Sequence, residues 1–357
     1  MINVTKTFLP PQEEYNAILK RAWDAGWITN RGTLVKELEE KLKIYLKVPN
    51  IIATTNGTLP LQIAIKALGL KGEIITTPFS YVATTSSIVW EGCTPVFVDI
   101  HPENLTIDEI KIEAAITPKT TGILATHVFG NPCAVEAIEA IAKKHNLKVI
   151  YDAAHCFGVT YKGKSIFEYG DVSTCSFHAT KLFHTGEGGA LFTQDRNLQD
   201  KLFYHHNFGH QGKEAFQGLG INAKMSELQA AMGLAVLPYI PTVIEQRKTI
   251  VAQYDAMFQD LPIQRVAIRE GTHWNYSYYP VLFQYEKQLL QVIAALEHKN
   301  IQPRRYFYPS LDSLPYCTLA DCPEAHSAAS RIVCLPLYVG LEASTVATIG
   351  SLIKNTL

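Results

Sequence analysis

Short apolar runs alternate with helical patterns through the first half of this chain, and this alternation strongly limits the possible folds. The runs are rich in isoleucine, valine and threonine, as strands buried on both faces are. Strands are expected over residues 51–55, 73–78, 95–100, 122–127 and 149–151, and helices from residue 56, over 82–90 and over 134–145. Repeated strand–helix–strand units with short connections form a mostly parallel sheet covered on both faces. The expected fold class is therefore α/β.

A single lysine stands between two further expected strands. Lys181 follows the largely apolar run 172–177 and precedes a glycine-rich turn that leads into residues 190–193, so we expect it on a loop. A partly apolar pocket there would disfavour the charged ammonium and leave a neutral amine that can attack a carbonyl. Taken alone, the residue also fits a solvated surface lysine in a hairpin loop.

An aspartate follows the expected strand at residues 149–151. Asp152 stands where that strand ends, which is the edge at which open α/β sheets bind ligands. Pyridoxal phosphate (PLP) needs a lysine that bonds to its aldehyde and an acid that pairs with its protonated pyridine nitrogen. Asp152 alone is equally suited to cap a following helix, but Asp152 and Lys181 together favour the cofactor.

The segments around these two residues resemble the DegT-type PLP-dependent nucleotide-sugar aminotransferases. The resemblance extends from about Thr29 to about Tyr338 and rests on several separated motifs. The run His178-Ala179-Thr180-Lys181 is most similar to that of the VioA-like enzymes, which aminate dTDP-4-keto-6-deoxy-glucose.

The resemblance implies the fold-type I architecture, which is that of aspartate aminotransferase. A large PLP-binding domain with a mostly parallel mixed sheet would include the N-terminal segment and span residues 1–240. A small C-terminal α/β domain would span residues 241–357. Its expected strands lie at 276–283, 301–306 and 331–337, and its expected helices at 288–298 and 343–353.

The resemblance also assigns residues to the cofactor. Lys181 would bond to PLP, and Asp152 would pair with the ring nitrogen. Tyr81 would stack on the ring, and His155, where most relatives carry glutamine, would hydrogen-bond its 3′-oxygen. The residues expected at the phosphate are Gly57, Thr58, Ser176 and, from a neighbouring subunit, Asn222. The last assignment requires a homodimer with shared active sites.

Several of these residues have a purely structural alternative. Thr58 and the neighbouring Asn56 are suited to cap the helix that follows, because a side-chain oxygen there satisfies free backbone N–H groups. Tyr81 also fits a core position, and His155 also fits the start of a helix.

Substrate contacts are expected from four residues. His184 and Thr185 stand where the family lines the sugar pocket, while Arg304 and Tyr306 form a cationic and aromatic pair suited to a diphosphate or a donor carboxylate. Arg305 adjoins Arg304, and adjacent residues on a strand point in opposite directions, so only one of the two arginines is expected to face the site.

Two positions depart from the family pattern. Gly32 is followed by Thr33 rather than by proline in a segment that lies near the sugar nucleotide in the family, which leaves a plain connecting loop as an alternative. Lys224 replaces an arginine near Asn222, so a bidentate contact is lost there.

Composition excludes several other classes. A net charge of −1 gives no field that would attract nucleic acid or an acidic membrane. The seven cysteines are scattered with no Cys-x-x-Cys pair, so neither a disulfide framework nor a zinc site is expected. The N-terminus lacks the regions of a signal peptide, and no membrane-length apolar run occurs. We expect a soluble, cytoplasmic protein without a metal.

The expected reaction moves an amino group from glutamate to a nucleotide-linked 4-keto-6-deoxy sugar, with pyridoxamine phosphate as the intermediate form of the cofactor. It would serve the biosynthesis of O-antigen or another polysaccharide or glycoconjugate. Amination at C3 and a non-catalytic sugar-nucleotide-binding homologue are the alternatives. The related sugar dehydratases carry histidine in place of Lys181, and no Gly-x-Gly-x-x-Gly turn supports a nicotinamide enzyme.

Overall fold

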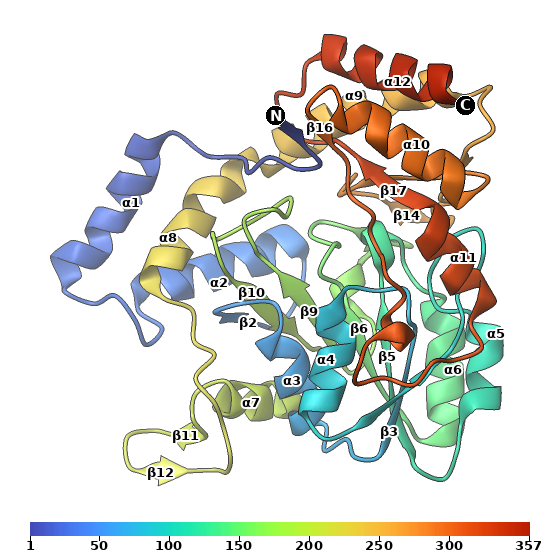
Figure 1. Cartoon of the computed structure of the whole chain (residues 1–357). Coiled ribbons are helices and arrows are strands. Elements are labelled where there is room, and N and C mark those ends of the chain that lie inside the picture. Colours follow the sequence, from blue (N-terminus) through green and yellow to red (C-terminus); the bar gives the residue numbers. More distant parts are fainter.

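The computed structural model describes all 357 residues and is built on a seven-stranded sheet (Figure 1). The strands lie in the order β2-β10-β9-β6-β5-β3-β4, and β10 alone runs antiparallel to its neighbours. Their bounds are β2 Ile51–Thr54, β3 Glu73–Thr76, β4 Thr94–Phe97, β5 Thr120–Thr126, β6 Lys148–Asp152, β9 Val172–Ser176 and β10 Gly189–Phe192. The mostly parallel mixed sheet expected from the sequence is confirmed.

Both faces of the sheet are covered by helices. Successive side chains on a strand point to opposite faces, so Ile51 and Ala53 join one core cluster while Ile52 joins another. The first cluster includes α2 (Thr33–Leu46), α6 (Val135–His145) and α8 (Glu227–Val236); the second includes α3 (Leu59–Ala67), α4 (Val82–Trp90) and α7 (Arg196–His205). This is why the strands read as continuous apolar runs in the sequence.

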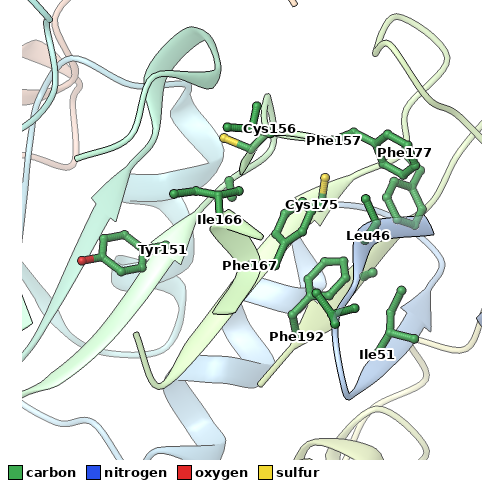
Figure 2. Close-up of a cluster of buried hydrophobic side chains, with 14 of the residues drawn as sticks. Leu46, Ile51, Tyr151, Cys156, Phe157, Ile166, Phe167, Cys175, Phe177 and Phe192 are labelled. Carbon is green, nitrogen blue, oxygen red and sulfur yellow. The ribbon is translucent and has the colours of Figure 1, made fainter. Parts of the chain in front are cut away.

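Stacked aromatic rings fill part of the larger cluster (Figure 2). The rings of Phe167 and Phe192 lie 4.1 Å apart at an interplanar angle of 11°, and those of Phe157 and Phe183 lie 4.3 Å apart at 14°. Burial of each such side chain contributes about 1.5–3 kcal/mol. The packing fixes the strands that carry the residues of the site.

The C-terminal part has a core of its own, which is drawn from residues between Ile250 and Ile353. A small antiparallel sheet of β13 (Gln264–Arg265), β15 (Tyr279–Leu282) and β17 (Ile332–Leu335) packs with α9 (Ile240–Phe258), α10 (Glu286–Glu297) and α12 (Ala343–Thr356). At the other end of the chain, β1 (Ile2–Asn3) pairs with β16 (Ile301–Gln302), so the first residues join this part. The domain boundary at residue 240 stays a prediction.

The remaining elements are short or peripheral. They are α1 (Gln12–Ala25), α5 (Glu109–Ile112), α11 (Pro323–Arg331), β7 (Thr160–Tyr161), β8 (Lys164–Ser165), β11 (His210–Gln211), β12 (Ala215–Phe216) and β14 (Thr272–His273). The β11–β12 hairpin projects from the body of the molecule at the lower left of Figure 1.

Two helix starts are joined across the sequence. Ser226 caps α8 through a reciprocal pair of hydrogen bonds with Gln229. The carboxylate of Glu227 instead accepts hydrogen bonds from the backbone N–H groups of Leu34 and Val35, at 2.7 and 3.2 Å, at the start of α2. A side chain at Gly32 would lie 2.7 Å from this carboxylate, so the close approach requires glycine.

One helical stretch, Glu227–Phe258, is long and apolar enough to span a membrane by length and composition. More than half of its most apolar window, 56%, is buried inside the structure, as in a core helix.

Candidate active site

The residues expected at the site come together at the carboxyl edge of the sheet. Asp152 and Ser176 are the last residues of β6 and β9, and the loops after β2 and β3 carry Gly57 and Tyr81. Lys181 comes from the connection between β9 and β10. Parallel strands with a common direction place all these loops on one side of the sheet.

The ε-amine of Lys181 lies in a small pocket that is also lined by His155, Ser176 and Tyr278. Its nitrogen lies 3.4 Å from the Tyr278 hydroxyl, which is the single hydrogen-bond partner of this amine in the structure. Burial lowers the pKa of Lys181, because the charged form loses its hydration. The pocket therefore favours the neutral, nucleophilic amine.

The carboxylate of Asp152 is 5% exposed and has two hydrogen-bond donors. The Thr84 hydroxyl donates to Oδ2 at 2.7 Å, and the backbone N–H of Ala154 donates to Oδ1 at 3.1 Å. Burial raises the pKa of Asp152, while these two donors and the nearby Lys181 lower it. A protonated pyridine nitrogen is a suitable partner for such a carboxylate.

The imidazole of His155 is held in one orientation. Its Nδ1 accepts a hydrogen bond of 3.1 Å from the backbone N–H of Phe129, so the neutral ring carries its proton on Nε2. Burial lowers the pKa of His155 far below its usual range, which keeps the ring neutral. Nε2–H has no partner in the chain, so it is free to donate to a ligand.

Gly57 and Ser176 form a narrow cradle at the start of α3. A Cβ at Gly57 would lie 2.7 Å from the Cβ of Ser176, so only glycine permits this approach. Asn56 caps the helix, because its Oδ1 accepts the backbone N–H groups of Thr58 and Leu59 at 2.9 Å each. The hydroxyl of Thr58 is left without a partner. Hydroxyls at a helix N-terminus suit a phosphate, so the residues present fit PLP.

Tyr81 lines a cleft of about 160 Å³. This residue is 52% exposed, whereas Phe79 in the same loop is fully buried in the core. Arg304 and Tyr306 line the same cleft, and the Arg304 guanidinium lies 4.9 Å from the centre of the Tyr306 ring. The cleft therefore offers an open aromatic face beside a cation.

The two adjacent arginines differ in their partners. The guanidinium of Arg305 binds the carboxylate of Glu286 at 2.7 Å and the carbonyls of Ala329 and Ser330. The guanidinium of Arg304 has no hydrogen-bond partner in the chain and is exposed. Arg304 is therefore the arginine that can bind an anionic ligand.

His184 and Thr185 are buried and bind the backbone. Nε2 of His184 lies 2.6 Å from the carbonyl oxygen of Phe8, and the hydroxyl of Thr185 donates to the carbonyl of Glu187 at 2.7 Å. Their expected role in the sugar pocket stays a prediction. Asn222 is exposed and accepts a hydrogen bond of 2.7 Å from Lys224, with no contact to the Lys181 pocket.

Three functional contacts were not expected from the sequence: those of Thr84, Phe129 and Tyr278. Thr84 stands in an expected helix and Tyr278 in an expected strand, where a hydroxyl next to apolar residues gives no signal of its partner. Phe129 contributes only its backbone N–H group, which no residue type signals. Thr84 meets an aspartate 68 residues away, and Tyr278 meets a lysine 97 residues away.

A mixed sheet covered on both faces, with a partly buried lysine and a buried aspartate at its carboxyl edge, is the arrangement of the fold-type I transferases. The chain belongs to the DegT/DnrJ/EryC1/StrS aminotransferase family, whose model matches residues 11–354. The resemblance, the fold and the aminotransferase class expected from the sequence are thereby confirmed.

Individual relatives cover almost the whole chain. A dTDP-4-amino-4,6-dideoxy-D-glucose transaminase of Shigella dysenteriae is 41% identical over 361 residues, which is 99% of this chain and 98% of the relative. The crystal structure of DesI with its TDP-sugar product superposes with a TM-score of 0.94 at 32% identity and covers 99% of this chain and 92% of that one. The PLP-form of the putative sugar aminotransferase Spr1654 from Streptococcus pneumoniae gives 0.90 at 25% identity, over 99% and 100% of the two chains.

Proposed function

We propose that this aminotransferase uses PLP to move an amino group from glutamate to C4 of dTDP-4-keto-6-deoxy-D-glucose. The observation that carries the proposal is that the partly buried Lys181 and the buried Asp152 lie at one edge of the sheet. The choice of sugar is supported by the 41% identical relative, whose name states a dTDP-4-amino-4,6-dideoxy-D-glucose product. Such an amino sugar would enter O-antigen or another glycoconjugate.

Bound PLP supplies an electron-withdrawing ring next to the amino group of the donor. Asp152 holds a negative charge where the ring nitrogen would lie. Nε2–H of His155 donates a hydrogen bond from a neutral ring, and Tyr81 offers an aromatic face. Lys181 would hold the cofactor, and its free amine would accept the proton from the α-carbon of the donor.

The cleft beside Tyr81 is the proposed entrance for the sugar nucleotide. Arg304 supplies a positive charge there that no side chain neutralises, and a diphosphate or a donor carboxylate carries the complementary charge. Because the chain has a net charge of −1, this local cation is the attraction that an anionic substrate would meet. Tyr306 adds an aromatic surface for the sugar.

We further propose a homodimer with shared active sites in the cytoplasm. Large exposed apolar side chains lie on α1, the loop after it, the segment leading to α8 and the first turn of α8. They are Trp23, Trp27, Ile28, Phe208, Phe216, Leu219, Ile221 and Leu228. The exposed Asn222 lies in the same segment, from which it would reach the cofactor phosphate of a partner. All seven cysteines are free thiols, as suits a reducing compartment.

The direct experiment incubates the purified protein with PLP, glutamate and a panel of dTDP-, UDP- and GDP-linked keto sugars. NMR of the product then locates the new nitrogen. We expect nitrogen at C4 of the dTDP sugar, with no product from a Lys181→Ala control. Nitrogen at C3 would support the C3 aminotransferase instead, and no product from any sugar would contradict the proposed activity.

A further inference from the structure

The hydroxyl of Tyr278 approaches Lys181 from the C-terminal part of the chain. We infer that Tyr278 is a positioning residue, which holds the ε-amine of Lys181 in the orientation needed for proton transfer whenever this amine is not bonded to the cofactor. The inference rests on the proposed function. It is carried by the 3.4 Å contact between Nζ and the phenolic oxygen, the amine's single hydrogen bond.

The ring of Tyr278 is packed on several sides. It is 3% exposed, and its centre lies 4.7 Å from the imidazole of His155, 5.4 Å from the ring of Tyr306 and 6.1 Å from that of Phe129. A side chain enclosed in this way has one accessible rotamer. The phenolic oxygen is therefore a fixed point, whereas the four-carbon stem of Lys181 is flexible.

The backbone that carries Tyr278 is fixed as well. The buried guanidinium of Arg247, on α9, donates to the carbonyls of Tyr276 and Ser277 at 2.9 and 2.6 Å. The hydroxyl of Ser277 donates to the carbonyl of Phe129 at 3.0 Å. These bonds join the segment before β15 to α9 on one side and to the loop that holds His155 on the other.

A phenol suits this task better than a carboxylate. Burial raises the pKa of Tyr278, so the hydroxyl stays neutral and does not trap Lys181 as an ammonium ion. It can accept a hydrogen bond from the charged amine or donate one to the lone pair of the neutral amine. One hydroxyl can thus hold the amine before and after the amine takes up a proton.

Other titratable groups also influence the amine. Asp152 on β6, Cys175 on β9, Tyr81 before α4 and Tyr306 after β16 all raise the pKa of Lys181, against the larger effect of burial. None of them hydrogen-bonds Nζ. A change confined to Tyr278 therefore tests orientation without removing a charge from the site.

The test compares Tyr278→Phe with Tyr279→Phe. Both variants lose one buried phenolic oxygen from the same segment, but the hydroxyl of Tyr279 bonds Asp255 and Arg265. With the PLP-loaded enzyme, Tyr278→Phe should lower kcat about 10- to 100-fold with little change in KM for glutamate. Tyr279→Phe should leave both constants close to wild type.

A second measurement uses cofactor-free protein and does not depend on activity. Acylation of Lys181 by a small reagent is followed against pH by peptide mass spectrometry. Loss of the phenolic oxygen destabilises the ammonium form more than the neutral amine, because hydrogen bonds to charged groups are the stronger ones. Tyr278→Phe should therefore move the midpoint to lower pH, and Tyr279→Phe should not. The inference would be overturned if Tyr278→Phe kept the wild-type acylation midpoint and kcat. It would also be overturned if Tyr279→Phe lowered the midpoint and kcat as much as Tyr278→Phe does. A wild-type enzyme that aminates no keto sugar would instead refute the proposed function, because the acylation comparison remains readable.

Discussion

The Thr84 hydroxyl donates a 2.7 Å hydrogen bond to the carboxylate of Asp152, and this bond sets the direction of two further hydrogen bonds between hydroxyl groups. Ser80 lies 2.7 Å from the Thr84 oxygen and 2.8 Å from that of Thr126. Each hydroxyl has one proton, so Thr126 donates to Ser80, Ser80 to Thr84 and Thr84 to Asp152. The three hydroxyl groups thereby fix Thr84 as a hydrogen-bond donor to the Asp152 carboxylate.

The first prediction removes that donor. Thr84→Val keeps the side-chain shape but leaves Asp152 with one donor fewer, which costs about 1–3 kcal/mol for a buried charged acceptor. The pKa of Asp152 should rise and PLP should bind about 10-fold or more weakly, as measured by equilibrium dialysis. Thr85→Val is the matched control, since the buried Thr85 hydroxyl has no hydrogen-bond partner. Equal affinities in the two variants would refute the role of Thr84.

The second prediction concerns the narrow approach of Gly57 to Ser176. In Gly57→Ala the added methyl group would lie 2.7 Å from the Ser176 side chain, so the loop must move away from β9. PLP affinity should fall by about 10-fold or more, because overpacking typically costs 1–3 kcal/mol. Gly218→Ala is the control, as its methyl group would meet nothing closer than 4.0 Å. Unchanged PLP affinity in Gly57→Ala would exclude a phosphate cradle at this loop.

The third prediction is the loss of stability in mild acid. Burial lowers the pKa of His127 to about 3 and that of His206 to about 4. The unfolded chain then binds more protons than the folded chain below about pH 6.5, so the free energy of unfolding falls as pH falls. Each of these histidines can lower the free energy of unfolding by up to about 1.4 kcal/mol for every unit that the pH falls below this value.

Urea unfolding at about pH 7.5 and about pH 5.5 measures this effect. His127→Asn should lose less stability between the two conditions than wild type, because the titrating ring is gone. In wild type, Nδ1 of His127 accepts a hydrogen bond of 3.0 Å from the backbone N–H of Cys133, and the asparagine side chain keeps an acceptor for this group. His298→Gln, at an exposed position, should lose as much as wild type. An equal loss in all three proteins would show that His127 titrates normally.

The fourth prediction tests whether active sites are shared. Lys181→Ala chains and Asn222→Ala chains should each be inactive or strongly impaired alone. In mixed dimers, one site receives Lys181 from one chain and Asn222 from the other, so part of the activity should return. Subunit exchange is verified by native mass spectrometry, and Lys181→Ala mixed with itself is the control. Mixed dimers without recovered activity would show that Asn222 does not serve its neighbour.

Much of the fold was predictable because it depends on local patterns. The strands carrying Asp152 and Ser176 are apolar runs bounded by turns, and they end within one residue of the expected positions. The antiparallel direction of β10 was not predictable in this way, since an apolar run has no preferred direction. The pairing of β1 with β16 likewise joins Ile2 to Ile301, and neither segment carries a sign of the other.

In the candidate site, too, residues identified by local sequence patterns were predictable, and contacts that depend on tertiary packing were not. Lys181 and Asp152 were predictable because strand ends and glycine-rich loops are where ligands bind in such sheets. The contact of Tyr278 depends on how the C-terminal part packs against the sheet, and no spacing in the sequence encodes that packing. Thr84 was hidden for a related reason: it lies inside a helix, where threonine is ordinary.

Lys181 is the residue proposed to carry the cofactor. Borohydride reduction of the PLP-loaded protein, followed by protease digestion and peptide mass spectrometry, identifies the residue that is bonded to PLP. We expect one phosphopyridoxyl group per chain, on the peptide that contains Lys181 and at that residue. A stable label on any other lysine, or a loaded protein with no reducible bond, would contradict it.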